Sequence, residues 1–304
     1  EAKIQLASRG GKVQILDEAR RPGKPLSPNH QQDIIMGIIL SIMAGLAIVV
    51  LIEFFDFSIR STSDISKFGL TILGIIPSIG DSIVNDGSIG FLKKYKKSSK
   101  INSKNMKRRL ITREDPRSPV SEAYRSLRTS LLYASVDKKT KSILVSSAGP
   151  GEGKTTTVAN MAITYANLGK KTLLIDTDLR RPVVHKVLDL KKEPGITNYL
   201  AGATNDFDGL IQQTDIDNLS VVTSGLIPPN PSELLGSNKM SSLVAKLEKT
   251  WDIILFDSPP LVAVTDATMV SKEIDKIVIV VKVGQTDKKA FEHTIKSLTN
   301  VNAP

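Results

Sequence analysis

The sequence has 304 residues and a formal net charge of +10, from 41 Lys and Arg against 31 Asp and Glu. It has no cysteine, which excludes disulfides and thiolate metal sites, and its three histidines lack ligand spacing. Ten basic residues and no acid lie between Phe91 and Arg113. The remainder is therefore close to neutral, and we expect no nucleic-acid-binding surface.

A chain of this length accommodates one sizeable α/β domain and a smaller part. Because the sequence begins at Glu1 rather than Met and stops within a helical pattern at Pro304, we expect a piece of a longer protein. Residues 1–32 are polar and contain three closely spaced prolines, which disfavour a helix and favour extended chain. Composition alone indicates a linker there.

The next stretch, Ile34 to Ile52, has nineteen residues without a charge. At 1.5 Å per residue it reaches roughly 28 Å, about the thickness of the hydrocarbon core of a bilayer. A signal peptide would have a shorter apolar core and a small-residue cleavage site. We predict a transmembrane helix over residues 33–53. Because ATP is cytosolic, the nucleotide site described below would place the following residues in the cytoplasm.

Residues 54–115 are predicted to form a juxtamembrane segment and a basic linker. Apolar residues between Asp64 and Gly80 predict a short helix followed by a strand. Residues 81–113 are rich in Ser, Asn and Lys, which is typical of a flexible tether. The basic cluster is consistent with a solvated linker or with binding to anionic lipids, and the sequence leaves both interpretations open.

A helix is predicted from Ser118. Steps of three residues place Glu122, Arg125 and Arg128 on one face, opposite an apolar face that should pack on the domain. A solvated charged face and a protein interface both fit this pattern.

The segment Ser146–Thr157 has the pattern of a phosphate-binding loop between an apolar run and an Ala-rich helical pattern. Glycines allow backbone N–H groups to converge on phosphate oxygens, and the N-terminus of a helix adds a favourable dipole. The usual first glycine is replaced by Ala148. We predict a nucleotide site formed by Gly149, Pro150, Gly151, Glu152, Gly153, Lys154, Thr155 and Thr156, with Lys154 on the phosphates and Thr155 on Mg²⁺.

Short apolar runs alternate with helical patterns on both sides of this loop. The runs cover residues 142–146, 172–176, 219–223, 252–257 and 276–281. Apolar strands separated by helices indicate a parallel sheet that is covered on both faces. The predicted fold class is α/β, a P-loop NTPase-like parallel sheet preceded by one transmembrane helix.

Three acids follow two of these strands. Asp176 and Asp178 lie at the end of one run, and Asp257 ends another. Ligands bind at the carboxyl edge of open α/β sheets. Each acid by itself could be a turn or cap residue. Together with Lys154 and Thr155, they could hold Mg²⁺ and accept a proton.

These motifs resemble those of the bacterial tyrosine kinases of capsular and exopolysaccharide biosynthesis, over nearly the whole chain. Residues Ala148–Thr155, Ile175–Arg180 and Ile253–Pro260 are similar to the three nucleotide motifs of that family. The spacing of Glu122, Arg125 and Arg128 is similar to its oligomerisation motif. The segment 225–233 is also similar to the family, although we could assign it no chemistry.

The resemblance implies an inner-membrane protein with a cytoplasmic kinase domain. Residues 1–32 would end a periplasmic chain-length determinant (co-polymerase) module, and residues 116–304 would form an incomplete kinase domain. The kinase would transfer phosphoryl groups from ATP to tyrosines of neighbouring subunits in a ring. Implied partners are the lipid bilayer, the polysaccharide polymerase and export machinery, and a protein tyrosine phosphatase.

The resemblance also implies roles for individual residues. Lys154 would neutralise phosphate charge, Thr155, Asp178 and Asp257 would hold Mg²⁺, and Asp176 would accept the tyrosine proton. The catalytic set is therefore Asp176, Lys154 and Asp178, with ATP and Mg²⁺ as cofactors.

Two features bear on alternatives to the kinase. Family members usually end in a tyrosine cluster, which this sequence lacks, so the acceptor would lie in a further tail or another protein. A partitioning-type P-loop ATPase, acting as a localisation switch, is the alternative. Those ATPases usually carry a lysine where this chain has Gly149, and they lack a preceding span.

Overall fold

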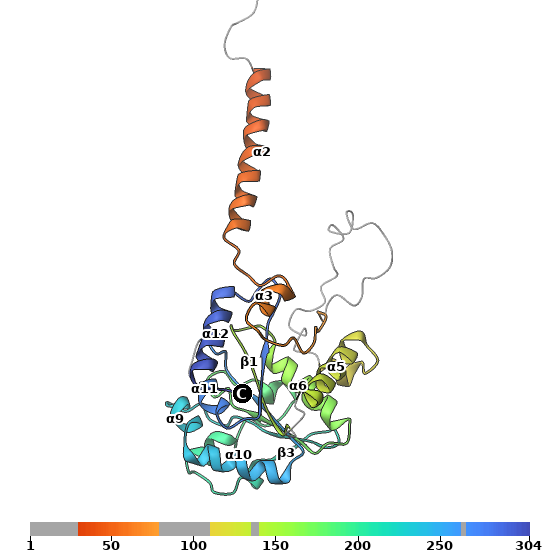
Figure 1. Ribbon diagram of the computed structural model, residues 1–304, viewed down its shortest axis with the longest axis vertical. Coiled ribbons are helices and arrows are strands. Elements are labelled where there is room, and N and C mark those ends of the chain that lie inside the picture. Colours follow the sequence, from red (N-terminus) through yellow and green to blue (C-terminus); the bar gives the residue numbers. More distant parts are fainter. Residues whose placement is uncertain (1–29, 79–109, 135–139, 263–265) are drawn as a thin grey trace, which may run out of the picture. The chain divides into compact units, whose positions relative to one another are not determined.

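The protein is described by a computed structural model that covers residues 30–78, 110–134, 140–262 and 266–304. It divides into two compact units, one ending at Asp56 and one spanning Phe57–Pro304. The first unit contains α2, His30–Phe54, which has 25 residues, none of them buried (Figure 1). In the described part of the chain, α2 is the one helix long and apolar enough to cross a membrane.

The second unit is built on a six-stranded sheet in the order β3-β4-β2-β5-β1-β6. Its strands are β1 Ser142–Ser147, β2 Thr172–Asp176, β3 Gln212–Gln213, β4 Leu219–Val222, β5 Ile253–Asp257 and β6 Lys276–Val280. All pairings are parallel except that of β3 with β4. The parallel α/β sheet is thus confirmed, and the two-residue antiparallel edge strand β3 was not predicted.

Helices connect the strands and cover the sheet. They are α3 Thr62–Ser66, α4 Ile111–Glu114, α5 Pro119–Tyr133, α6 Lys154–Ala166, α7 Val184–Val187, α8 Ile196–Leu200, the 3-10 turn η3 Asp208–Leu210, α9 Pro231–Leu235, α10 Asn238–Thr250, α11 Asp266–Ser271 and α12 Lys288–Asn300. Side chains cap three of the longer helices, because Ser118, Ser237 and Asp287 accept N–H groups from the first turns of α5, α10 and α12.

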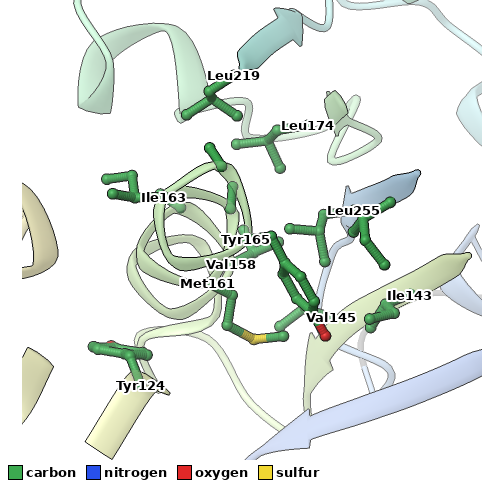
Figure 2. Packing of buried hydrophobic residues seen from close by; sticks show 14 of the residues in the cluster. Tyr124, Ile143, Val145, Val158, Met161, Ile163, Tyr165, Leu174, Leu219 and Leu255 are labelled. Atoms are coloured by element: carbon green, nitrogen blue, oxygen red, sulfur yellow. The ribbon is translucent and has the colours of Figure 1, made fainter. Parts of the chain in front are cut away.

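Each face of the sheet carries its own apolar core. On one face α6 is buried between the strands and α5, and Figure 2 shows its side chains beside those of β1, β2, β4 and β5. On the other face α10 and α11 pack against the same strands. In Figure 1, α5 and α6 lie on one side of β1, and α11 and α12 lie on the other. Burial on both faces explains why the strands read as unbroken apolar runs.

The segment after α2 belongs to the second unit. Ile59 is buried in a cluster with Ala148 and Phe291. Its N–H donates to the Thr286 carbonyl at 2.8 Å, and its own carbonyl accepts from the N–H of Gly284 at 2.9 Å. Residues that we assigned to a juxtamembrane segment therefore pack on the domain, because the backbone groups of this segment find partners beside β6.

The structure differs from the prediction for residues 64–80 in one respect. The short helix is present as α3, but residues 67–78 contain no strand. The side chains of Leu73 and Ile76 instead are partly buried against the core around α6. The compact unit also includes Thr112, which bonds to the buried Asn160 of α6 through its N–H at 3.0 Å and its hydroxyl at 2.8 Å. The predicted basic cluster, apart from Arg113, lies outside the described residues.

Candidate nucleotide-binding and phosphoryl-transfer site

The predicted phosphate loop joins the end of β1 to the start of α6. Gly151 and Gly153 have φ angles of 79° and 98°, in the left-handed region that residues with a side chain rarely adopt. Gly153 is the N-cap residue of α6, which begins at Lys154. The loop therefore directs unpaired N–H groups of a helix N-terminus toward the carboxyl edge of the sheet.

Lys154 lies among acids from the carboxyl ends of β2 and β5. Its Nζ is 2.8 Å from Asp178 Oδ2 and 4.0 Å from Asp257 Oδ1, and all three side chains are largely buried. Burial opposes the lysine charge, but the neighbouring Asp257 and Asp178 outweigh it and raise the pKa of Lys154 above its ordinary value. The ammonium is thus charged at the position where phosphate oxygens would approach the loop.

Thr155 connects the phosphate loop to β5. Its hydroxyl donates to Asp257 Oδ2 at 2.7 Å. Asp257 lies opposite Asp176 in the register of β5 and β2, which is why acids 81 positions apart meet. At this edge of the sheet, the Asp178 and Asp257 carboxylates therefore both lie near the Lys154 ammonium, and Asp257 also accepts the Thr155 hydroxyl.

Asp176 is fully buried at the end of β2. Its Oδ1 accepts the N–H of Asp178 and its Oδ2 accepts the N–H of Val184, each at 3.2 Å. Burial, followed by repulsion from Asp257 and Asp178, raises the pKa of Asp176 well above its ordinary value. A raised pKa suits a group that accepts a proton near neutral pH.

The residues present fit Mg²⁺ and a nucleotide triphosphate. Left-handed glycines expose N–H groups at a helix N-terminus, a lysine follows, and hard oxygen ligands gather beside a threonine hydroxyl. When bound, Mg²⁺ would neutralise charge that develops on the transferring phosphoryl group.

Glu152 is placed differently from the rest of the predicted nucleotide set. Burial raises the pKa of Glu152, and interactions with the Thr286 hydroxyl and with the N–H groups of Gly149 and Ala148 offset part of that rise. The carboxyl group therefore braces the loop from within, which leaves only the backbone of Glu152 for a phosphate. The methyl group of Ala148 lies in the cluster with Ile59, which explains why glycine is not required there.

Sequence reasoning missed a second cluster at this edge. Arg180 Nε and Nη2 donate to the two carboxyl oxygens of Asp266 at 2.7 and 3.2 Å, and the Ser232 hydroxyl donates to the same carboxylate. Asp266 is fully buried. The bonds tie the loop after β2 to α9 and α11, and so supply a contact for the 225–233 segment. No local pattern could reveal it, because the partners are 34 and 86 positions apart.

The predicted interface residues of α5 divide into two groups. Arg125 donates to Glu122 at 2.8 Å and to the Pro116 carbonyl at 2.6 Å, on the exposed side of the helix. Arg128 instead turns inward and donates from Nη1 to the Thr164 carbonyl of α6 at 2.7 Å. Arg128 thus joins α5 to α6, whereas Glu122 and Arg125 remain available on the surface.

Comparisons with known proteins show the family of this chain. Residues 140–303 match the family model described as an AAA domain. A tyrosine-protein kinase of Bacillus subtilis (strain 168), YwqD, is 43% identical over 184 residues, which are 60% of this chain and 77% of YwqD. The chain belongs to the bacterial tyrosine-protein kinase family. The fold and the resemblance expected from the motifs are confirmed.

Other members of the kinase family extend the match toward the N-terminus. A putative tyrosine-protein kinase of Erwinia amylovora, AmsA, is 31% identical over 296 residues, or 97% of this chain, and the match spans 40% of AmsA. The kinase domain of the Escherichia coli tyrosine kinase ETK superposes with a TM-score of 0.69 at 26% identity, covering 81% of this chain and 91% of that domain.

Proposed function

We propose that this chain is an ATP-dependent protein-tyrosine kinase that phosphorylates tyrosines of neighbouring subunits. One observation carries the proposal: Lys154 and Thr155 at the start of α6 contact Asp178 and Asp257 from two neighbouring strand ends. This arrangement joins a phosphate-binding loop to oxygen ligands for Mg²⁺ within one site. The names of the relatives, all tyrosine-protein kinases, support the same activity.

In the proposed reaction, the phenolic oxygen of a tyrosine attacks the γ-phosphorus of ATP and the bond to the β-γ bridging oxygen breaks. The Lys154 ammonium would exchange its contact with Asp178 for a contact with the phosphates, because the carboxylate and the phosphates are anions that compete for the same cation. Thr155, Asp178 and Asp257 would hold Mg²⁺, which would neutralise charge on the phosphates. Asp176 accepts the phenolic proton, and its raised pKa favours this transfer. Positioning and charge neutralisation are the main requirements of this chemistry.

We further propose that the kinase works at the inner membrane in capsular or exopolysaccharide polymerisation and export. The helix α2 would be its span, with residues 1–32 periplasmic and the kinase domain cytoplasmic. Subunits would assemble into a ring through Glu122, Arg125 and Arg128 of α5. A chain-length determinant module, export machinery and an opposing phosphatase remain predictions from the motif resemblance.

The test is phosphotyrosine mapping after incubation of the full-length protein with ATP and Mg²⁺. Lys154→Met and Asp176→Asn should abolish phosphoryl transfer, and a cooperative thermal transition checks that both variants are folded. An exposed substitution, Asp217→Asn, is the control and should retain activity. ATP hydrolysis without phosphotyrosine on any protein or peptide would favour the partitioning-type ATPase switch instead.

A further inference from the structure

The tyrosines that the structure describes differ sharply in exposure. Tyr124 and Tyr165 are buried in the core on either side of the α5–α6 contact. Tyr199 is half-buried, with its ring edge-on to Phe207 and beneath the Lys239 ammonium. Tyr133 is 79% exposed at the last residue of α5. Within the described residues, Tyr133 is therefore the most exposed tyrosine.

Tyr133 also shares a surface with the proposed interface residues. Helical spacing places Glu122, Arg125, Thr129 and Tyr133 on one stripe of α5, opposite the buried stripe. Its ring is thus presented on the face that a neighbouring subunit would approach.

Tyr133 cannot reach the site of its own chain. The Tyr124 hydroxyl interacts with Thr157 near the start of α6, whereas Arg128 binds the Thr164 carbonyl near its end. The two helices therefore run in the same direction, and Tyr133 lies beyond the end of α6 that is farthest from Lys154. The length of α6 alone is about 20 Å at 1.5 Å per residue. A tyrosine side chain does not span that distance.

We infer that Tyr133 is an autophosphorylation site that is modified in trans, by the kinase site of another copy of this chain. The inference rests on the proposed kinase function and names an acceptor for it. Its phenolic oxygen bonds to the γ-phosphorus of ATP on the second copy, ADP leaves, and the phenolic proton passes to Asp176 of that copy. The product adds about −1.5 to −2 charges at pH 7 to the end of the stripe that carries Arg125.

The experiment mixes two full-length variants in detergent micelles with ATP and Mg²⁺. One is an isotope-labelled Lys154→Met chain, which has Tyr133 but no phosphate-binding lysine. The other is an active Tyr133→Phe chain, which can phosphorylate but lacks this acceptor. Mass spectrometry follows Tyr133 of the labelled chain, and a synthetic Glu/Tyr copolymer reports kinase activity. Tyr199→Phe in the active chain is the matched control.

We expect phosphate on Tyr133 of the labelled chain only when the active chain is present, at a rate that rises with its concentration. The Tyr133→Phe and Tyr199→Phe chains should phosphorylate the copolymer equally well. If the copolymer is phosphorylated and Tyr133 is not, with phosphate at Tyr95 or elsewhere, this inference is wrong and the kinase function stands. Phosphate on Tyr133 of the active wild-type chain, with none on Tyr133 of the labelled Lys154→Met chain assembled with it, would exclude the trans reaction. If neither protein nor copolymer is phosphorylated, the kinase function itself fails.

Discussion

The Lys154 ammonium lies 2.8 Å from the Asp178 carboxylate, and both side chains are largely buried. The pair joins the phosphate loop to the end of β2 and places the lysine next to Asp257. It also means that a bound phosphate must compete with an acid for the same cation. Stability and nucleotide binding are therefore coupled at this pair.

We predict that Lys154→Met destabilises the protein by about 3–5 kcal/mol, because it leaves Asp178 and its acidic neighbours without a cation. Adding Asp178→Asn removes one uncompensated charge, so the double variant should be more stable than Lys154→Met. Urea unfolding of wild type, both single variants and the double variant measures the coupling. Simple addition of the two single effects would show that the pair is not coupled.

The stability of the protein should depend on pH through Asp176. Its folded-state pKa is raised from 3.8, so the folded state binds this proton more tightly than the unfolded state does. This contribution is fully present below about pH 4 and is lost as the pH rises through the folded pKa. We predict that Asp176→Asn removes that decline in the free energy of unfolding.

The measurement for Asp176 is urea unfolding at several pH values from 4 upward. Asp217→Asn, at an exposed acid before β4, should keep the wild-type pH dependence. Identical slopes for wild type and Asp176→Asn would contradict the raised pKa.

Substitution of Arg128 should lower the stability of the protein more than substitution of Arg125. Arg128→Ala should lower the free energy of unfolding by about 1.5–3 kcal/mol, because a charged donor to the Thr164 carbonyl is lost. Arg125→Ala removes exposed contacts and should change stability by about 0.5 kcal/mol or less. Chemical denaturation distinguishes them, while sedimentation velocity reports assembly. Arg125→Ala that unfolds as readily as Arg128→Ala would argue against this division.

Packing of the segment after α2 can be tested at Ile59. This side chain is 1% exposed in the cluster with Ala148, so Ile59→Ala should destabilise the domain by about 2–5 kcal/mol. Ile75 is 71% exposed, and Ile75→Ala should have little effect. Differential scanning calorimetry compares the two variants with wild type. Equal melting temperatures for Ile59→Ala and Ile75→Ala would mean that the segment does not contribute to the folded unit.

Local sequence patterns determined much of the fold and of the candidate site. Unbroken apolar runs specified the parallel strands, because a strand buried on both faces has no polar side. The loop before α6 was recognisable because phosphate binding requires glycines, a lysine and a threonine in consecutive positions. Asp176, Asp178 and Asp257 were predicted because strand ends of a parallel sheet meet at one edge.

Only the tertiary structure decided which side chains meet across long separations. Periodicity placed Arg128 with Glu122 and Arg125, but the Thr164 carbonyl lies within its reach and draws it inward. The Glu152 side chain is buried beside Thr286, a contact across 134 positions that the loop motif does not specify. The contact of Arg180 with Asp266, and the docking of Ile59 against Ala148, join segments that are distant in sequence. Such contacts depend on how the helices pack on the sheet, and this packing cannot be predicted from a local sequence pattern.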